Sequence, residues 1–408
     1  MRTMEKTSST TAPAIASGEE IRDFKVNKAP QAELDELKRR ILATRWPEKE
    51  PVDDQTQGVP LATMKALADY WATEYDWRKV EAKLNSYPNF ITNVDGLDIH
   101  FIHVRSKHPN ALPLLVTHGW PGSIIEQLKI IGPLTDPTAY GGNAEDAFDV
   151  VIPSIPGYGY SEKPSTTGWG PSRIAYAWVT LMKRIGYEKF FAQGGDWGGL
   201  ITDIMAVQSP DNILGMATNF PCTVPIEINN AAFGGAPAPD GLSEEEKKAY
   251  DQLVFSYKHV SYALIMGSRP QTLLATADSP VGLATIFLDH DQRSLTLISR
   301  IFAGHTEGLT RDDVLDNITL CWLTNTAVSG YRIYWENKHA FVAPLGVNVP
   351  VVVSAFPDEL YQAPRTWAEK AYPKMIYYKK HNKGGHFAAW EQPELLVNDI
   401  RAGFKSIR

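Results

Sequence analysis

The sequence contains little cysteine, no long apolar run and no excess of basic residues. Cys222 and Cys321 are its only cysteines, and without a visible export signal they predict buried thiols in a cytoplasmic protein. No run of about 18 or more apolar residues occurs, which argues against a membrane-spanning helix. The net charge is −7 without a long basic stretch, so we expect no nucleic-acid partner. A globular protein of 408 residues remains, long enough to bury a substantial core.

The N-terminal part of the chain divides into a tail and a helical region. Residues 1–21 are polar and rich in small residues, which predicts a flexible tail. The stretch 29–48 carries apolar residues at helical spacing, and 61–84 predicts a second helix with aromatic packing. We therefore expect residues 22–90 to form a helical region ahead of the main fold.

Short apolar runs alternate with helical stretches over residues 91–220 and again over 346–408. The runs lie at 112–119, 147–157, 189–195, 213–220, 348–359 and 374–381. Strands alternating with helices predict an α/β fold with a mostly parallel central sheet and helices on both faces. Between the two parts, residues 221–345 have helical patterns, with Ser243 and Glu246 in capping-box register. A helical insertion at this place predicts a cap over the carboxyl edge of the sheet.

The heptapeptide "QGGDWGG" (193–199) places one carboxylate among four glycines where a strand should meet a helix. Gly194, Asp196 and Gly198 fit the pattern G-x-nucleophile-x-G, in which a sharp turn exposes the central side chain above the sheet. The alternative is that Asp196 only caps the helix that follows. The choice between them depends on the loops that would surround the aspartate.

Two backbone N–H groups are predicted to face this turn. The loop "HGWPGS" (118–123) follows a predicted strand and can turn the N–H of Trp120 toward Asp196. The N–H of Trp197, directly after the aspartate, would supply the second donor. Such a pair forms an oxyanion hole.

A histidine and a carboxylate complete the pattern. "NKGGHFAAWEQP" (382–393) places His386 in a loop after the last predicted strand. "SAFPDEL" (354–360) places Asp358 and Glu359 after the strand before it, and the spacing does not separate these two carboxylates. The chain order nucleophile, acid, histidine is typical of an α/β-hydrolase.

An aspartate nucleophile restricts the chemistry. A carboxylate that attacks a saturated carbon forms an ester, which a histidine-activated water can hydrolyse. This indicates epoxide opening or dehalogenation. An epoxide oxygen needs a proton donor when it leaves, whereas a halide does not, and tyrosine suits this task. The predicted cap contains five tyrosines, each of which is also a common packing residue: Tyr250, Tyr257, Tyr262, Tyr331 and Tyr334.

The motifs together resemble one family. "HGWPGS", "IPGYGYS" (155–161), "GGDWGG" and "GGHFAAWEQPE" are similar to the core motifs of epoxide hydrolases of the microsomal-type α/β-hydrolase group. The resemblance covers the chain from about residue 22 to its end, including the N-terminal region that wraps around core and cap in that family. It implies that Asp196 is the nucleophile and His386 the base, and it favours Glu359 over Asp358 as the acid.

The same resemblance selects two cap tyrosines. Tyr262 precedes "SRPQTLLATADSP", and Tyr334 lies in "RIYWEN", which correspond to the family's tyrosine-bearing stretches. Tyr331, one helical turn from Tyr334, is the alternative.

The resemblance also implies a reaction. We expect an apolar epoxide and water to give a vicinal diol, without metal or cofactor and without the membrane anchor of the microsomal members. Base rates favour a homodimer. A haloalkane dehalogenase on the same scaffold and a non-catalytic binding protein are the two alternatives.

Overall fold

The computed structural model describes residues 18–408. The tail predicted over 1–21 falls mainly on residues 1–17, which lie outside the described residues. From residue 18 onward the chain runs beside the sheet. The backbone carbonyl of Gly18 accepts from Asn93 N–H at 3.2 Å, and the carbonyl of Glu19 accepts from the Thr92 hydroxyl at 3.0 Å.

One mixed sheet organises the described chain, in the strand order β1-β2-β3-β5-β4-β6-β7-β8-β9. Its strands are β1 (Arg22–Phe24), β2 (Asn89–Val94), β3 (Leu97–Val104), β4 (Leu112–Thr117), β5 (Phe148–Pro153), β6 (Phe190–Gly194), β7 (Ile213–Thr218), β8 (Val351–Ala355) and β9 (Met375–Lys380). The strands from β5 to β9 pair in parallel, whereas β1, β2 and β3 form an antiparallel edge. All residues of β6 and β8 are buried, as expected for central parallel strands.

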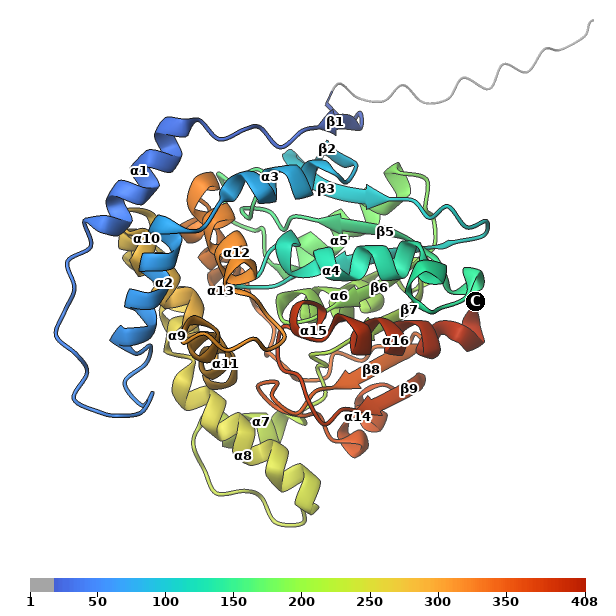
Figure 1. The fold of residues 1–408 in the computed structure, drawn as a ribbon. Coiled ribbons are helices and arrows are strands. Elements are labelled where there is room, and N and C mark those ends of the chain that lie inside the picture. The colour runs from blue at the N-terminus through green and yellow to red at the C-terminus, as the bar shows by residue number, and fades with distance from the viewer. Residues whose placement is uncertain (1–17) are drawn as a thin grey trace, which may run out of the picture.

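Helices cover both faces of this sheet (Figure 1). One face carries α4 (Ile124–Thr135), α15 (Ala388–Glu391) and α16 (Pro393–Phe404). The other carries α5 (Pro171–Arg184), α6 (Trp197–Gln208) and α14 (Arg365–Ala371). This arrangement confirms the predicted α/β-hydrolase fold.

A group of helices lies between β7 and β8, in the stretch predicted to be an insertion, and we call them the cap. They are α7 (Ile226–Phe233), α8 (Glu244–His259), α9 (Ser261–Ser268), α10 (Pro280–Leu288), α11 (Gln292–Phe302), α12 (Arg311–Thr324) and α13 (Ala327–Glu336). Ser243 and Glu246 form the expected capping box at the start of α8. Among residues 18–408, none of the helices has the length and apolar character needed to span a membrane.

The N-terminal region joins the sheet to the cap. Its helices are α1 (Gln31–Leu42), α2 (Leu61–Thr73) and α3 (Trp77–Asn85). The single helix predicted over 61–84 is therefore wrong, because Asp76 interrupts it. The Asp76 carboxylate accepts from Arg78 N–H and caps α3 as a separate helix. From α2, Trp71 Nε1 donates to Thr319 of α12 at 3.0 Å, so the region packs on the cap (Figure 1).

Buried Asp203 on α6 gives the fold a testable pH dependence. Burial raises the pKa of its carboxyl to about 8, although the Tyr372 hydroxyl donates to it at 2.9 Å. Between about pH 4 and that value the folded chain holds a proton that the unfolded chain releases, so rising pH lowers the free energy of unfolding, by up to about 1.4 kcal/mol per pH unit. Asp203→Asn removes this group, and we expect its Tm to fall less than that of the wild type between pH 5 and pH 8. Parallel Tm curves would contradict this assignment.

Candidate active site

Asp196 lies in a sharp turn between β6 and α6. Its backbone has φ 51° and ψ −130°, a conformation that a non-glycine residue rarely adopts. The chain also passes close to itself on both sides. A Cβ on Gly194 would lie 2.1 Å from the carbonyl oxygen of Gly198, and one on Gly198 would lie 2.0 Å from that of Thr117. The aspartate makes no side-chain cap hydrogen bond, so helix capping does not explain its position.

The loop after β4 contacts the same carboxylate. Trp120 N–H donates to Asp196 Oδ1 at 2.7 Å. This approach requires the glycine before it, because a Cβ on Gly119 would lie 2.2 Å from Oδ1. The structure thus brings Trp120 to the position predicted for an oxyanion-hole donor. The backbone N–H of Trp197 also stabilises the ionised form of Asp196.

His386 contacts Asp196 on one side and Glu359 on the other. Its Nδ1 lies 2.5 Å from Glu359 Oε1, and its Nε2 lies 3.4 Å from Asp196 Oδ2. All three side chains are buried. Asp358 instead points outward, where its half-exposed carboxylate pairs with Arg293 at 3.3 Å. The structure therefore brings Glu359, and not Asp358, to the histidine.

The electrostatics of this group favour an ion pair. Burial would raise the pKa of Asp196, but His386, His290 and the Trp197 N–H together hold it below its usual value. Burial would lower the pKa of His386, but the Glu359 and Asp196 carboxylates raise it well above its usual value. The site at rest thus combines an ionised aspartate with an imidazolium.

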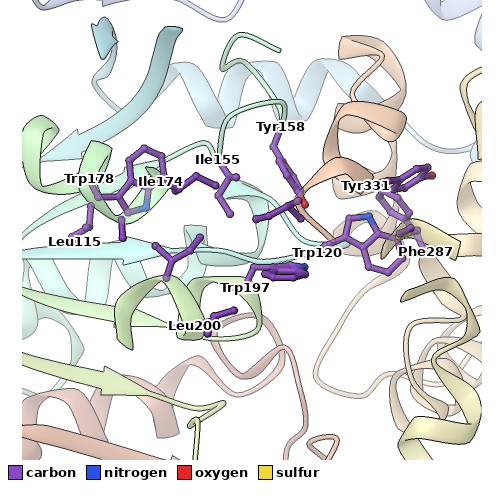
Figure 2. Packing of buried hydrophobic residues seen from close by; sticks show 14 of the residues in the cluster. Leu115, Trp120, Ile155, Tyr158, Ile174, Trp178, Trp197, Leu200, Phe287 and Tyr331 are labelled. Atoms are coloured by element: carbon purple, nitrogen blue, oxygen red, sulfur yellow. The ribbon is translucent and has the colours of Figure 1, made fainter. Parts of the chain in front are cut away.

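Tyr262 of α9 and Tyr334 of α13 lie above the aspartate, where aromatic rings from core and cap meet. The ring centroids of Trp120 and Tyr262 are 4.7 Å apart, and those of Trp197 and Tyr334 are also 4.7 Å apart. The two tyrosine rings are 6.2 Å apart. Burial raises the pKa of both hydroxyls well above 10, so they stay protonated and can donate. Figure 2 shows Phe287 of the cap next to Trp120, in agreement with the edge-to-face contact of their rings.

The other cap tyrosines use their hydroxyls for structural bonds. Tyr331 donates to the Thr276 hydroxyl at 2.9 Å, and Tyr250 donates to the carbonyl of Ala236 at 2.7 Å. Tyr257 bonds the side chain of Asn229. These three hydroxyls are engaged within the cap, and the choice of Tyr262 and Tyr334 stays a prediction.

A second histidine–carboxylate pair was not found from the sequence. His290 Nδ1 lies 2.9 Å from Asp291 Oδ2, and its Nε2 lies 4.0 Å from Asp196 Oδ2. Its ring centroid is 4.3 Å from that of His386. The only signal was the tripeptide "DHD" (289–291) after an apolar helix, and this tripeptide has no catalytic motif around it.

The same side chains offer ligand atoms for a metal ion. Within residues 18–408, one ligand atom each from Asp196, His290 and His386 lie within 4.8 Å of one another. A metal bound there would occupy the carboxylate and the imidazole that face each other at the turn. Such binding would compete with any chemistry in which Asp196 acts as the nucleophile.

A sharp strand-to-helix turn beneath a helical cap, at which an aspartate, a histidine and a glutamate come together, is the arrangement of an α/β-hydrolase. A family model for the epoxide hydrolase N terminus matches residues 21–127, and one for the alpha/beta hydrolase fold matches residues 113–246.

Known proteins agree with this class over nearly the whole chain. A protein of Stigmatella aurantiaca (strain DW4/3-1) whose name assigns it to the epoxide hydrolases is 48% identical over 397 residues, which cover 95% of this chain and 86% of that protein. Epoxide hydrolase 1 of Sus scrofa is 37% identical, with 95% of this chain and 89% of that protein covered. The crystal structure of juvenile hormone epoxide hydrolase from the silkworm Bombyx mori matches with a TM-score of 0.83 and 29% identity, covering 96% of this chain and 95% of that one. The chain belongs to the epoxide hydrolase family, as its motifs predicted, and it is an enzyme.

Proposed function

We propose that this enzyme converts an apolar epoxide and water to a vicinal diol through an ester on Asp196. The observation that carries the proposal is that the two carboxylate oxygens of Asp196 have different contacts. Oδ1 accepts from Trp120 N–H, whereas Oδ2 faces His386 Nε2. Oδ1 is therefore held where the carbonyl oxygen of the ester would lie, and Oδ2 is the oxygen that attacks the epoxide carbon.

The first step opens the epoxide ring. Tyr262 and Tyr334 hydrogen-bond the ring oxygen, and Asp196 Oδ2 attacks a ring carbon from the opposite side. The carbon–oxygen bond of the ring breaks, and one tyrosine gives its proton to the departing oxygen. The product is a hydroxyalkyl ester of Asp196, and the imidazolium of His386 loses a proton that restores the tyrosine.

Ester formation prepares the second step by changing the charge beside His386. The Asp196 carboxylate contributes to the raised pKa of this histidine, and an ester carries no such charge. The pKa of His386 therefore falls after the first step, so the imidazole can act as a base. Glu359 keeps its ring oriented throughout.

The second step cleaves the ester. Water gives a proton to His386 Nε2, and its oxygen bonds to Cγ of Asp196. The N–H groups of Trp120 and Trp197 stabilise the negative charge on Oδ1. The bond from Cγ to the alkyl oxygen then breaks, and the diol oxygen takes the proton from His386. The second proton of the water passes from the new carboxyl group to His386, so the carboxylate and the imidazolium are both restored, and the carboxylate keeps one oxygen from water.

The walls of the site support an apolar substrate. Phe287 lies 5.7 Å from the Trp120 ring, and Phe341 lies 4.8 Å from the Trp197 ring, measured between centroids. These rings surround the nucleophile together with the two tyrosines. A haloalkane dehalogenase would share the elbow but would have no need for two buried tyrosine donors, so the epoxide is favoured.

A single turnover in heavy-oxygen water tests the proposal. With enzyme in excess over styrene oxide, we expect the heavy atom in the side chain of Asp196 and not in the first diol released. A heavy atom found only in the diol would show that water attacks the ring directly. Halide release from a haloalkane, in the absence of diol formation from styrene oxide, would favour the dehalogenase.

The tyrosine assignment gives a graded expectation. Tyr262→Phe and Tyr334→Phe should each lower kcat/KM by about 10- to 100-fold, and the double variant by about 10³-fold or more, because general-acid assistance is lost. Tyr331→Phe is the matched control and should stay within about 3-fold, since its hydroxyl bonds Thr276. Steady-state diol formation measures all four variants. A larger loss in Tyr331→Phe than in either single variant would reverse the assignment.

A further inference from the structure

A small cavity lies next to the nucleophile, and neither of the two proposed tyrosine donors lines it. Its lining consists of core residues alone, among them Glu126, Asp196, Asn219 and His386. Its volume is about 10 Å³, which is about the space that one water molecule needs. A water in this cavity would lie beside Asp196 and His386 without lining contact from the cap, beneath which the epoxide is held.

The polar atoms around the cavity suit a water molecule. His386 Nε2 and Gln127 Oε1 belong to lining residues and are fully buried. Neither makes a hydrogen bond within the described chain, because the 3.4 Å contact of His386 Nε2 with Asp196 Oδ2 is an ion pair without hydrogen-bond geometry. A buried water needs two to four such partners. His386 Nε2 is also the atom that takes a proton from water in the proposed second step.

Glu126 adds a carboxyl to the same cavity. It lies in the first turn of α4, is 7% exposed, and accepts from Gln127 Nε2 at 2.7 Å. Its other oxygen lies where a side chain would begin on Gly122, because a Cβ there would be only 1.6 Å from Oε2. The loop after β4 therefore leaves room for this carboxyl.

The protonation of Glu126 fits this place. Burial raises its pKa to about 8, while the charge of His386 lowers it and that of Asp196 raises it. At pH 7 it is mostly neutral, so it brings little further negative charge beside the nucleophile. A neutral carboxyl can also donate one hydrogen bond and accept another, which lets it orient a water molecule.

We propose that Glu126 is a positioning residue that holds the attacking water between His386 Nε2 and Cγ of Asp196. The inference rests on the proposed ester, and it assigns the position of the water molecule that hydrolyses this ester. The water loses one proton to His386 Nε2, and its oxygen bonds to Cγ, while Glu126 keeps its own proton. Glu126 has no part in ring opening, which takes place on the cap side.

Rapid mixing with excess enzyme separates the two steps. Mass spectrometry at successive times gives the rate of ester formation and the rate of its decay. In Glu126→Leu we expect formation within about 3-fold of wild type and decay slowed about 10- to 100-fold, because a misplaced water reacts that much more slowly. Glu126→Gln keeps a donor and an acceptor and should recover part of the loss.

Asp203→Asn is the matched control, because Asp203 is a second buried carboxyl with a pKa of about 8 that lies outside the site. It should leave the decay rate unchanged. Decay as fast in Glu126→Leu as in the wild type would overturn the proposal, and so would equal slowing of both steps. If Glu126→Leu does not fold, Glu126→Ala takes its place, and its rates of ester formation and ester decay are compared with those of the wild type in the same way.

His386→Gln separates this failure from failure of the proposed function. If no adduct appears even in that variant, then no ester forms and both proposals fall. If an adduct accumulates there while Glu126→Leu behaves as the wild type, only the role of Glu126 is overturned.

Discussion

Asp196→Asn is expected to lower epoxide turnover by a factor on the order of 10⁴ or more, since removing a catalytic nucleophile costs at least this much. An amide has the same shape as the carboxylate and can still accept from Trp120 N–H. It lacks the negative charge that attacks the ring carbon in the proposed mechanism, and it leaves His386 with one carboxylate neighbour instead of two. The loss should therefore come from the chemical step, while the fold is preserved.

The measurement is diol formation from styrene oxide at enzyme concentrations high enough to detect residual activity. Asp203→Asn makes the same change on the helix that follows Asp196 and should keep turnover within about 3-fold of the wild type. A folded Asp196→Asn protein that retains more than about a hundredth of wild-type turnover would contradict a covalent role for this carboxylate.

His386→Gln is expected to stop the reaction halfway. In the proposed mechanism Asp196 and the tyrosines open the ring, so the ester should still form in this variant. Its hydrolysis needs a base, which glutamine does not provide. We expect decay to slow by about 10³-fold or more. The protein should then gain the mass of one epoxide molecule, and peptide mapping should place it on Asp196.

His381→Gln is a close control for this experiment. His381 is also a buried histidine on a carboxylate, with its Nε2 2.6 Å from Asp399 Oδ2, and it lies outside the group around Asp196. No adduct should accumulate in this variant. An adduct in both variants, or one that maps to another residue, would contradict the assignment of His386 as the base.

The parts of the site that lie in contiguous motifs could be predicted from the sequence. The elbow depends on close contacts between neighbouring backbones, so glycines at 194 and 198 mark it directly. Trp120 follows because the loop after β4 and the elbow end adjacent parallel strands. The fold class was accessible for a similar reason, since apolar runs of strand length alternate with helices.

Other features depend on tertiary packing that spacing does not encode. Asp358 and Glu359 are neighbours, and the path of their loop decides between them. Asp358 N–H donates to the carbonyl of Gly384 at 3.1 Å, which joins this loop to the one that carries His386. The adjacent Glu359 side chain then faces the histidine.

Two further buried polar residues at the site also depend on tertiary packing, so the sequence alone did not indicate them. His290 belongs to the cap and Glu126 to the first turn of α4, and only the packing of those elements brings them near Asp196. Neither residue lies in a pattern that distinguishes it from an ordinary polar residue in a helix or loop.

The N-terminal region has a consequence for how molecules enter and leave. Its first strand is paired with β2, while Trp71 and Tyr75 bond Thr319 and Asp316 of α12 at 3.0 Å each. The N-terminal region is thus bonded both to the central sheet and to the cap that covers the active site. A hinge motion that lifts the cap would break these hydrogen bonds. We therefore expect substrate entry and product release to depend on rotation of individual aromatic side chains, and bulky substrates to enter slowly.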